Sequence, residues 1–273
     1  MKSSKLLPIP KFRYSIVFIL FLLAGSLSGQ ILKVDRRSVL KDTSHYWYGN
    51  LDFRLNVNNG STTPEKSFVF IGLKGNLDVN YASKEHAYML VNNINYFTTG
   101  TGPFVSTGYA HFRINWYRRR TLSYETFSQI QYDRGRNLQR RVLTGGGIKI
   151  NFFQRKKSYF HAGIGMMYES ESWRDFEGTI RQVNLAKSSS YLGGVFELNE
   201  NLDINLTCYY QTGYADQLDQ YLHRLSGDFN LILQINERFQ YVTNFQLQYE
   251  SRPIIMINKV FYSLTNGLKI RLG

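Results

Sequence analysis

The stretch Thr121 to Phe153 reads TLSYETFSQIQYDRGRNLQRRVLTGGGIKINFF, and it decides the fold. In its first arm the apolar residues Leu122 and Tyr124 alternate with Ser123 and Glu125, and the second arm repeats the alternation in IKINF. Successive side chains of a strand point to opposite faces, so each arm has an apolar face and a polar face. The two arms therefore predict a long antiparallel β-hairpin. We interpret it as part of a transmembrane β-barrel.

The composition favours strands over membrane-spanning helices. The chain has 273 residues, among which 20 Tyr and 19 Phe are high counts. Aromatic residues favour strands and gather where a barrel meets the membrane surface. The mean hydropathy is only −0.32, as expected when apolar residues are distributed in alternation.

The formal net charge of +13 indicates anionic partners. Four of these positive charges lie in the first thirteen residues: Lys2, Lys5, Lys11 and Arg13. The others are spread over turns, loops and polar strand faces, whereas a nucleic-acid-binding protein gathers them on one surface. We therefore expect outer-membrane lipids and lipopolysaccharide as partners, and no nucleic acid.

The first 29 residues have the pattern of a secretory signal peptide. A basic start is followed by the apolar run Ile16 to Ala24 and by small residues up to Gly29. The alternative is an uncleaved anchor, but the apolar run is too short to cross a bilayer comfortably. We expect a signal peptide over residues 1–29, a periplasmic lead-in over 30–45 and one barrel over 46–273 in the cell outer membrane.

The two-residue period continues through the rest of the chain and predicts an all-β fold, an antiparallel up-and-down barrel of about twelve strands of the outer-membrane type. The expected strands are Tyr46 to Asn58, Ser67 to Ala82, Ala87 to Thr98, Thr107 to Tyr117, Thr121 to Asp133, Gln139 to Phe152, Ser158 to Glu171, Ser188 to Asn199, Leu202 to Tyr214, Tyr221 to Ile235, Phe239 to Glu250 and Asn258 to Leu272. Short links are expected after even strands and longer loops after odd strands, the longest being Ser172 to Lys187. This rhythm is typical of bacterial outer-membrane barrels.

The apolar faces are expected to contact lipid, because a charged side chain at the bilayer midplane costs roughly 2–4 kcal/mol. A soluble, lipocalin-like barrel would turn the same apolar faces inward, and alternation alone does not separate the two. Strand number, strand length and loop rhythm favour the membrane. The single cysteine, Cys208, lies on an apolar face and is expected to be a small lipid-facing side chain.

The polar faces would then line the lumen. The candidate lumen-lining residues are Asp52, Arg54, Lys74, Asp78, His111, Arg113, Glu125, Lys149, His161, Glu169, Asp228, Lys269 and Arg271. Two interpretations stay open: opposite charges pair and plug the barrel, or they line a narrow polar passage. Barrels of about eight strands are filled and those of about sixteen are open, so twelve lies between them. We favour a constricted interior.

A basic junction lies at the predicted outer rim. It consists of Arg134, Arg136, Arg140 and Arg141, whose guanidinium groups could bind lipopolysaccharide phosphates, with Arg134, Arg136 and Arg140 as the main candidates. An ordinary solvated loop is the alternative.

No motif for metal, cofactor or catalysis stands out. The five histidines do not lie at ligand spacing, and no nucleophile elbow is present. We therefore expect no cofactor, no metal and no enzymatic activity. A membrane-embedded lipid hydrolase using His111 or His161 is the third and least favoured class of function.

Two segments carry a family resemblance. Phe127 to Gly147, FSQIQYDRGRNLQRRVLTGGG, followed by Gly163 to Glu171, GIGMMYESE, resembles the YdiY-like, salt-induced outer-membrane proteins, a family of unknown function. The resemblance is strongest over Tyr124 to Glu171 and implies an outer-membrane barrel and no catalytic residue. We expect the barrel-assembly machinery as a partner while such a barrel is assembled. One departure is the final Gly273, because such barrels commonly end in an aromatic residue.

The first functional hypothesis is a narrow channel for small polar solutes or ions, or a protein of the envelope response to stress such as salt. The second is a structural barrel with a plugged lumen that docks a partner or lipopolysaccharide.

Overall fold

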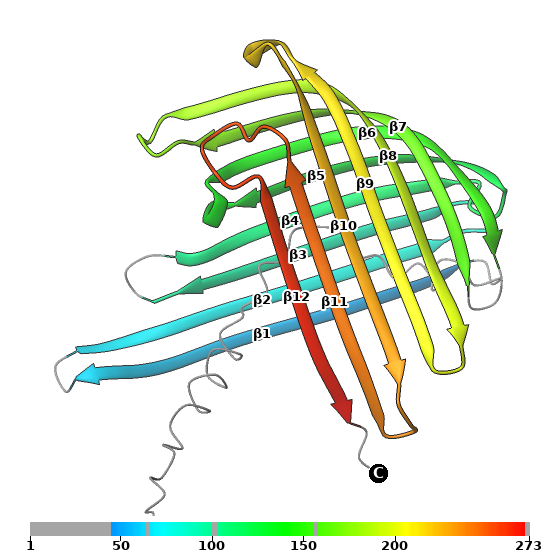
Figure 1. The fold of residues 1–273 in the computed structure, drawn as a ribbon, viewed down its shortest axis with the longest axis horizontal. Helices are drawn as coiled ribbons and strands as arrows, with labels where there is room; N and C mark the ends of the chain where they lie inside the picture. The colour runs from blue at the N-terminus through cyan, green and yellow to red at the C-terminus, as the bar shows by residue number, and fades with distance from the viewer. Residues whose placement is uncertain (1–44, 64–65, 100–102, 155–157, 271–273) are drawn as a thin grey trace, which may run out of the picture.

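The computed structural model describes residues 45–63, 66–99, 103–154 and 158–270 (Figure 1). It consists of one twelve-stranded sheet in which the strands follow each other in sequence order, each antiparallel to the next. The strands are β1 (Tyr46–Thr63), β2 (Lys66–Ala82), β3 (Ala87–Thr98), β4 (Pro103–Trp116), β5 (Leu122–Asp133), β6 (Leu138–Gln154), β7 (Tyr159–Arg174), β8 (Ile180–Asn199), β9 (Leu202–Ala215), β10 (Gln220–Gln234), β11 (Phe239–Glu250) and β12 (Val260–Ile270), with short 3-10 turns η1 (Arg134–Arg136) and η2 (Asp216–Leu218). The all-β, up-and-down prediction with twelve strands is confirmed. No helix of the described residues is long and apolar enough to cross a membrane.

The predicted signal peptide, and the lead-in up to residue 44, lie outside the described residues.

The sheet is strongly curled. Figure 1 shows β9 to β12 passing in front of the first strands at a steep angle to them. Side chains meet across the concave face, since Tyr191 of β8 donates a hydrogen bond to Glu125 of β5, and Arg141 of β6 lies 3.6 Å from Glu250 of β11. The concave face therefore encloses an interior. In the described pairings β1 has β2 as its neighbour and β12 has β11.

The two faces of the sheet differ as the alternation predicts. On β7 the side chains of Ile164 and Met166 are 63% and 68% exposed, whereas those of Met167 and Glu169 are 3% and 0% exposed. The same alternation on β5 exposes the apolar residues and buries Glu125. The convex face is thus predominantly apolar, and most buried charges lie on the concave face.

The links after even strands are short, as expected, but most of the longer loops expected after odd strands are absent, because the strands run further than expected. The stretch from Ser172 to Lys187 is mostly strand: β7 continues to Arg174, β8 begins at Ile180, and the connection is only 175–179. Val183 and Leu185 of β8 are buried and extend the alternation into this stretch. The connection that stays long is 251–259, between β11 and β12.

Candidate functional site inside the sheet

Six buried charged side chains meet on the concave face. They form the interior charge cluster, which consists of Arg141, Glu169, Glu171, Lys187, Arg224 and Glu250. Each is less than one-tenth exposed, and the three cations balance the three carboxylates. Alternation places the six side chains on the same face of the sheet. The curl of the sheet then brings those of β6, β7 and β8 into contact with those of β10 and β11.

Arg224 is the centre of the interior charge cluster. Its Nη1 lies 2.8 Å from Glu169 Oε2, its Nη2 lies 2.7 Å from Glu171 Oε1, and its Nε lies 3.1 Å from Glu250 Oε1. Arg141 also contacts Glu171, and Lys187 contacts Glu169. Removing ions from water is unfavourable, so such a cluster is stable only when each charge keeps its partners.

An apolar cap lies over the interior charge cluster at the end where 251–259 connects β11 to β12. Its members are Leu138, Trp173, Val183, Leu185, Ala215, Leu222, Ile254 and Ile255. Ile254 packs against both parts of the cap, so the connection folds back over the interior; it is the orange-red loop of Figure 1. Trp173 Nε1 donates a 2.9 Å hydrogen bond to Glu171 Oε2, which joins the cap to the cluster.

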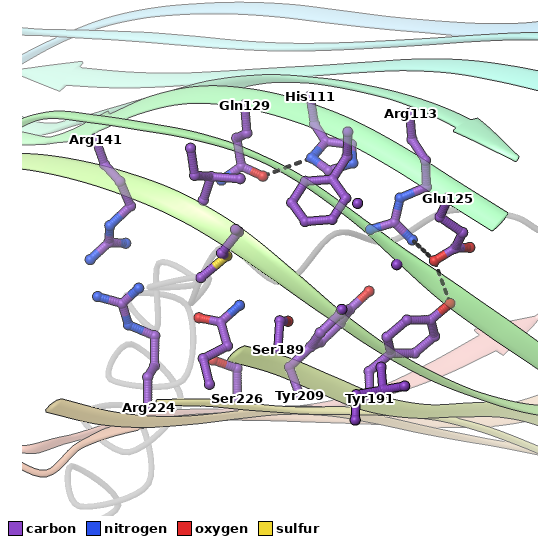
Figure 2. Close-up of a pocket in the computed structure, with 18 of the residues that line it drawn as sticks. His111, Arg113, Glu125, Gln129, Arg141, Ser189, Tyr191, Tyr209, Arg224 and Ser226 are labelled. Carbon is purple, nitrogen blue, oxygen red and sulfur yellow. Dashed lines mark hydrogen bonds and ion pairs between the residues drawn. The ribbon is translucent and has the colours of Figure 1, made fainter. Parts of the chain in front are cut away.

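A cavity of about 110 Å³ borders the interior charge cluster (Figure 2). Arg141 and Arg224 face each other at one end of it, and Arg113 and Glu125 reach in from one wall toward Tyr191 on the other. Glu125 Oε2 accepts a hydrogen bond from the Tyr191 hydroxyl and lies 3.8 Å from Arg113 Nη1. The wall also holds His111, whose Nδ1 lies 2.9 Å from Gln129 Oε1.

Glycines on the concave face make room for the side chains that cross the interior. A Cβ on Gly163 would overlap the Tyr191 ring, and a Cβ on Gly213 would lie 2.8 Å from Lys187 Cγ. Tyr191 of β8 therefore passes over β7 at Gly163 on its way to Glu125. Glycine relieves crowding at these two positions.

The structure places seven of the predicted lumen residues in the buried interior, namely His111, Arg113, Glu125, Lys149, His161, Glu169 and Asp228. Four of these, His111, Arg113, Glu125 and Glu169, belong to the cavity wall or the interior charge cluster. Lys74 and Asp78 of β2 are half-buried. The side chain of Lys269 and the whole of Arg271 lie outside the described residues.

Asp52 and Arg54 of β1 alternate with the exposed Leu51, Phe53 and Leu55, but Asp52 is only half-buried and Arg54 is exposed. They pair with each other, with Arg54 Nη2 2.8 Å from Asp52 Oδ2, and the Arg54 side chain is 64% exposed. The reason is the position of β1 at the end of the sheet, where β2 is its one described neighbour.

The predicted basic rim is corrected at two residues, Arg136 and Arg141, and Arg141 is buried in the interior charge cluster. Arg134 and Arg140 are exposed, but Arg136 turns inward, with Nε 2.7 Å from Asp133 Oδ2 and Nη1 3.0 Å from Gln248 Oε1. The positive charge of Arg136 is therefore neutralised by Asp133 within the protein.

Sequence reasoning assigned Arg141 to the rim and missed much of the rest of the site, namely Glu171, Lys187, Arg224, Glu250, Tyr191 and Tyr209. Alternation could have identified most of them, since they occupy the polar face of their strands. Lys187 was assigned to a loop, and the pairing of Arg224 with β7 depends on the curl of the sheet. Among the described residues there is no group of His, Cys, Asp and Glu that could hold a metal ion.

Comparisons with known proteins give a family and a distant structural likeness. Residues 71–255 match the family model described as "Protein of unknown function, DUF481". No curated protein matches the chain. Among solved structures, "NanC porin structure in rhombohedral crystal form" is similar at a TM-score of 0.43 and 10% identity, over 80% of this chain and 100% of that chain. A likeness this distant carries no argument about function.

Proposed function

The chain belongs to the family of unknown function DUF481, and from this premise we propose that it is an outer-membrane β-barrel whose interior is closed. This function is the structural or interaction barrel that the sequence left as the second hypothesis. The observation that carries it is the apolar cap joined to the interior charge cluster, which together fill one end of the interior.

The apolar convex face supports a membrane location. Exposed large apolar side chains recur on alternate positions of most strands, for example Leu51, Phe53 and Leu55 of β1, which are 72%, 65% and 60% exposed. A water-soluble protein rarely exposes so large a continuous apolar surface, whereas lipid is a favourable environment for it. A lipocalin-like barrel would bury these residues on the inside.

The buried charges support closure of the interior. The interior charge cluster spans β6, β7, β8, β10 and β11, so it crosses from one side of the curled sheet to the other. An open polar passage would leave these side chains hydrated, but each is less than one-tenth exposed. We therefore favour a plugged interior over a continuous channel.

Planar-bilayer recording tests the proposal. The purified protein, with insertion checked by heat-modifiable migration on gels, is expected to give no regular conductance steps. The variant Ile254→Ser/Ile255→Ser loosens the apolar cap and should give transient openings. Met256→Ser is the matched control, because Met256 lies in the same connection but is 85% exposed; it should stay silent. Regular steps from the unaltered protein would contradict the closed interior.

The proposed membrane location and the exposed positive charges indicate which partners the protein binds. Exposed Arg134 and Arg140 remain candidates for binding lipopolysaccharide phosphates. The YdiY-like resemblance adds a role in the envelope response to salt, without enzymatic activity. Both belong to the proposal.

A further inference from the structure

Arg113 is a buried cation with unused hydrogen-bond donors. It is 4% exposed, and within the described residues its Nε and Nη1 have no hydrogen-bond partner. The nearby carboxylate, Glu125 Oε2, lies 3.8 Å from Nη1, which is beyond hydrogen-bonding distance. Buried donors without an acceptor are rare and unfavourable. An acceptor that entered the cavity beside Arg113 would therefore be stabilised.

Tyr209 supplies a second donor on the opposite wall. Its hydroxyl oxygen is buried and interacts with the Arg113 guanidinium, and its O–H has no acceptor within hydrogen-bonding geometry in the described part of the chain. Figure 2 shows the Tyr209 ring reaching into the cavity from the wall opposite to Arg113. The two groups can thus donate to one acceptor from two sides.

The charge and the walls of the cavity select the class of ligand. Three arginines line it, but Arg141 and Arg224 are paired with the carboxylates of the interior charge cluster, whereas Arg113 shares Glu125 with Tyr191. The donors that Arg113 leaves unused favour an anionic acceptor, because charge-assisted hydrogen bonds are the stronger ones. The remaining wall includes apolar carbon from side chains such as Phe127, Leu143 and Met167. An organic anion satisfies both features better than an inorganic one.

The size of the cavity suits a small ligand. A single water needs roughly 10–15 Å³ of such space, and the cavity offers about 110 Å³. We propose that the cavity is a binding site for a small carboxylate, held by Arg113 and Tyr209. The proposal goes beyond the closed barrel, since a conducting barrel could hold the same ligand.

Titration of the folded protein in detergent micelles with ¹³C-labelled acetate tests this site, followed by NMR line broadening and shift. Saturable binding with a dissociation constant of roughly millimolar is expected for so small a ligand. Acetamide has nearly the same shape without the charge and should bind at least about tenfold more weakly, because hydrogen bonds to charged groups are the stronger ones.

Two variants link the binding to the site. Tyr209→Phe should weaken acetate binding several-fold without loss of the fold. Arg113→Gln/Glu125→Gln removes both charges together, so that no buried charge is left alone, and should abolish binding. The matched control is Asp52→Asn/Arg54→Gln, which removes an exposed ion pair on β1 and should bind acetate normally.

Four results would contradict the proposed carboxylate site. Equal binding of acetate and acetamide, stronger binding of inorganic phosphate than of acetate, or full binding by the folded Arg113→Gln/Glu125→Gln variant would overturn the proposal. Absence of saturable acetate binding would do the same, and conductance does not enter any of these measurements.

Discussion

Arg224→Met is expected to lower the free energy of unfolding by about 3–5 kcal/mol, because it leaves a buried negative charge uncompensated. Three carboxylates, Glu169, Glu171 and Glu250, now share the guanidinium of Arg224. Without it, they would keep only two of the three cations of the interior charge cluster. Urea unfolding of the protein in lipid vesicles, followed by tryptophan fluorescence, measures the change.

Two controls separate this effect from general disturbance. Arg134→Met removes an exposed arginine and should change the free energy of unfolding by less than about 0.5 kcal/mol. Arg224→Met/Glu169→Gln restores the balance of charge and should recover part of the loss. If Arg224→Met were as stable as Arg134→Met, the cluster would not be the stabilising centre of the interior.

Trp173→Ala is expected to cost about 3–5 kcal/mol, since it removes the largest fully buried side chain of the apolar cap. Trp173 packs with Leu138 and Ile255, and its Nε1 donates to Glu171. The loss therefore combines a cavity in the cap with a missing hydrogen bond to the cluster. The same unfolding measurement detects it, and bilayer recording should show openings like those of the loosened cap.

Trp47→Ala is the matched control, because Trp47 is 71% exposed whereas Trp173 is 1% exposed. Trp173→Phe keeps most of the ring but not the N–H, and should cost about 1–3 kcal/mol, the usual effect of leaving a buried acceptor without its donor. A Trp173→Ala protein as stable as Trp47→Ala would show that the cap does not close the interior.

The sequence predicts the strands well because their signal is local. The alternation of Leu122, Tyr124 and Glu125 is visible within a few residues, and the same period continues through every strand. The strand ends of β7 and β8 were placed wrongly because the stretch between them is mostly polar, and the buried Val183 and Leu185 are a weak signal there.

The site was predicted only in part because it depends on the curl of the sheet. Alternation places Arg113 and Glu169 inside, but it does not tell which strands face each other across the interior. The contact between Tyr191 and Glu125 joins residues 66 positions apart in sequence and requires Gly163 beneath the ring. The inward turn of Arg136 likewise depends on Gln248 of β11, which lies far away in the chain.

Nitroxide scanning along β11 tests the central claim, that the apolar convex face contacts lipid. Single cysteines replace Phe245, Gln246, Leu247, Gln248 and Tyr249 in turn, with Cys208→Ser as background, and each is spin-labelled in lipid vesicles. Phe245 and Tyr249 are 36% and 37% exposed, while Gln246 and Gln248 are 5% and 6% exposed. Collisions with oxygen dissolved in the lipid should be frequent at the odd positions and rare at the even ones; equal or reversed accessibility would contradict a membrane-spanning barrel.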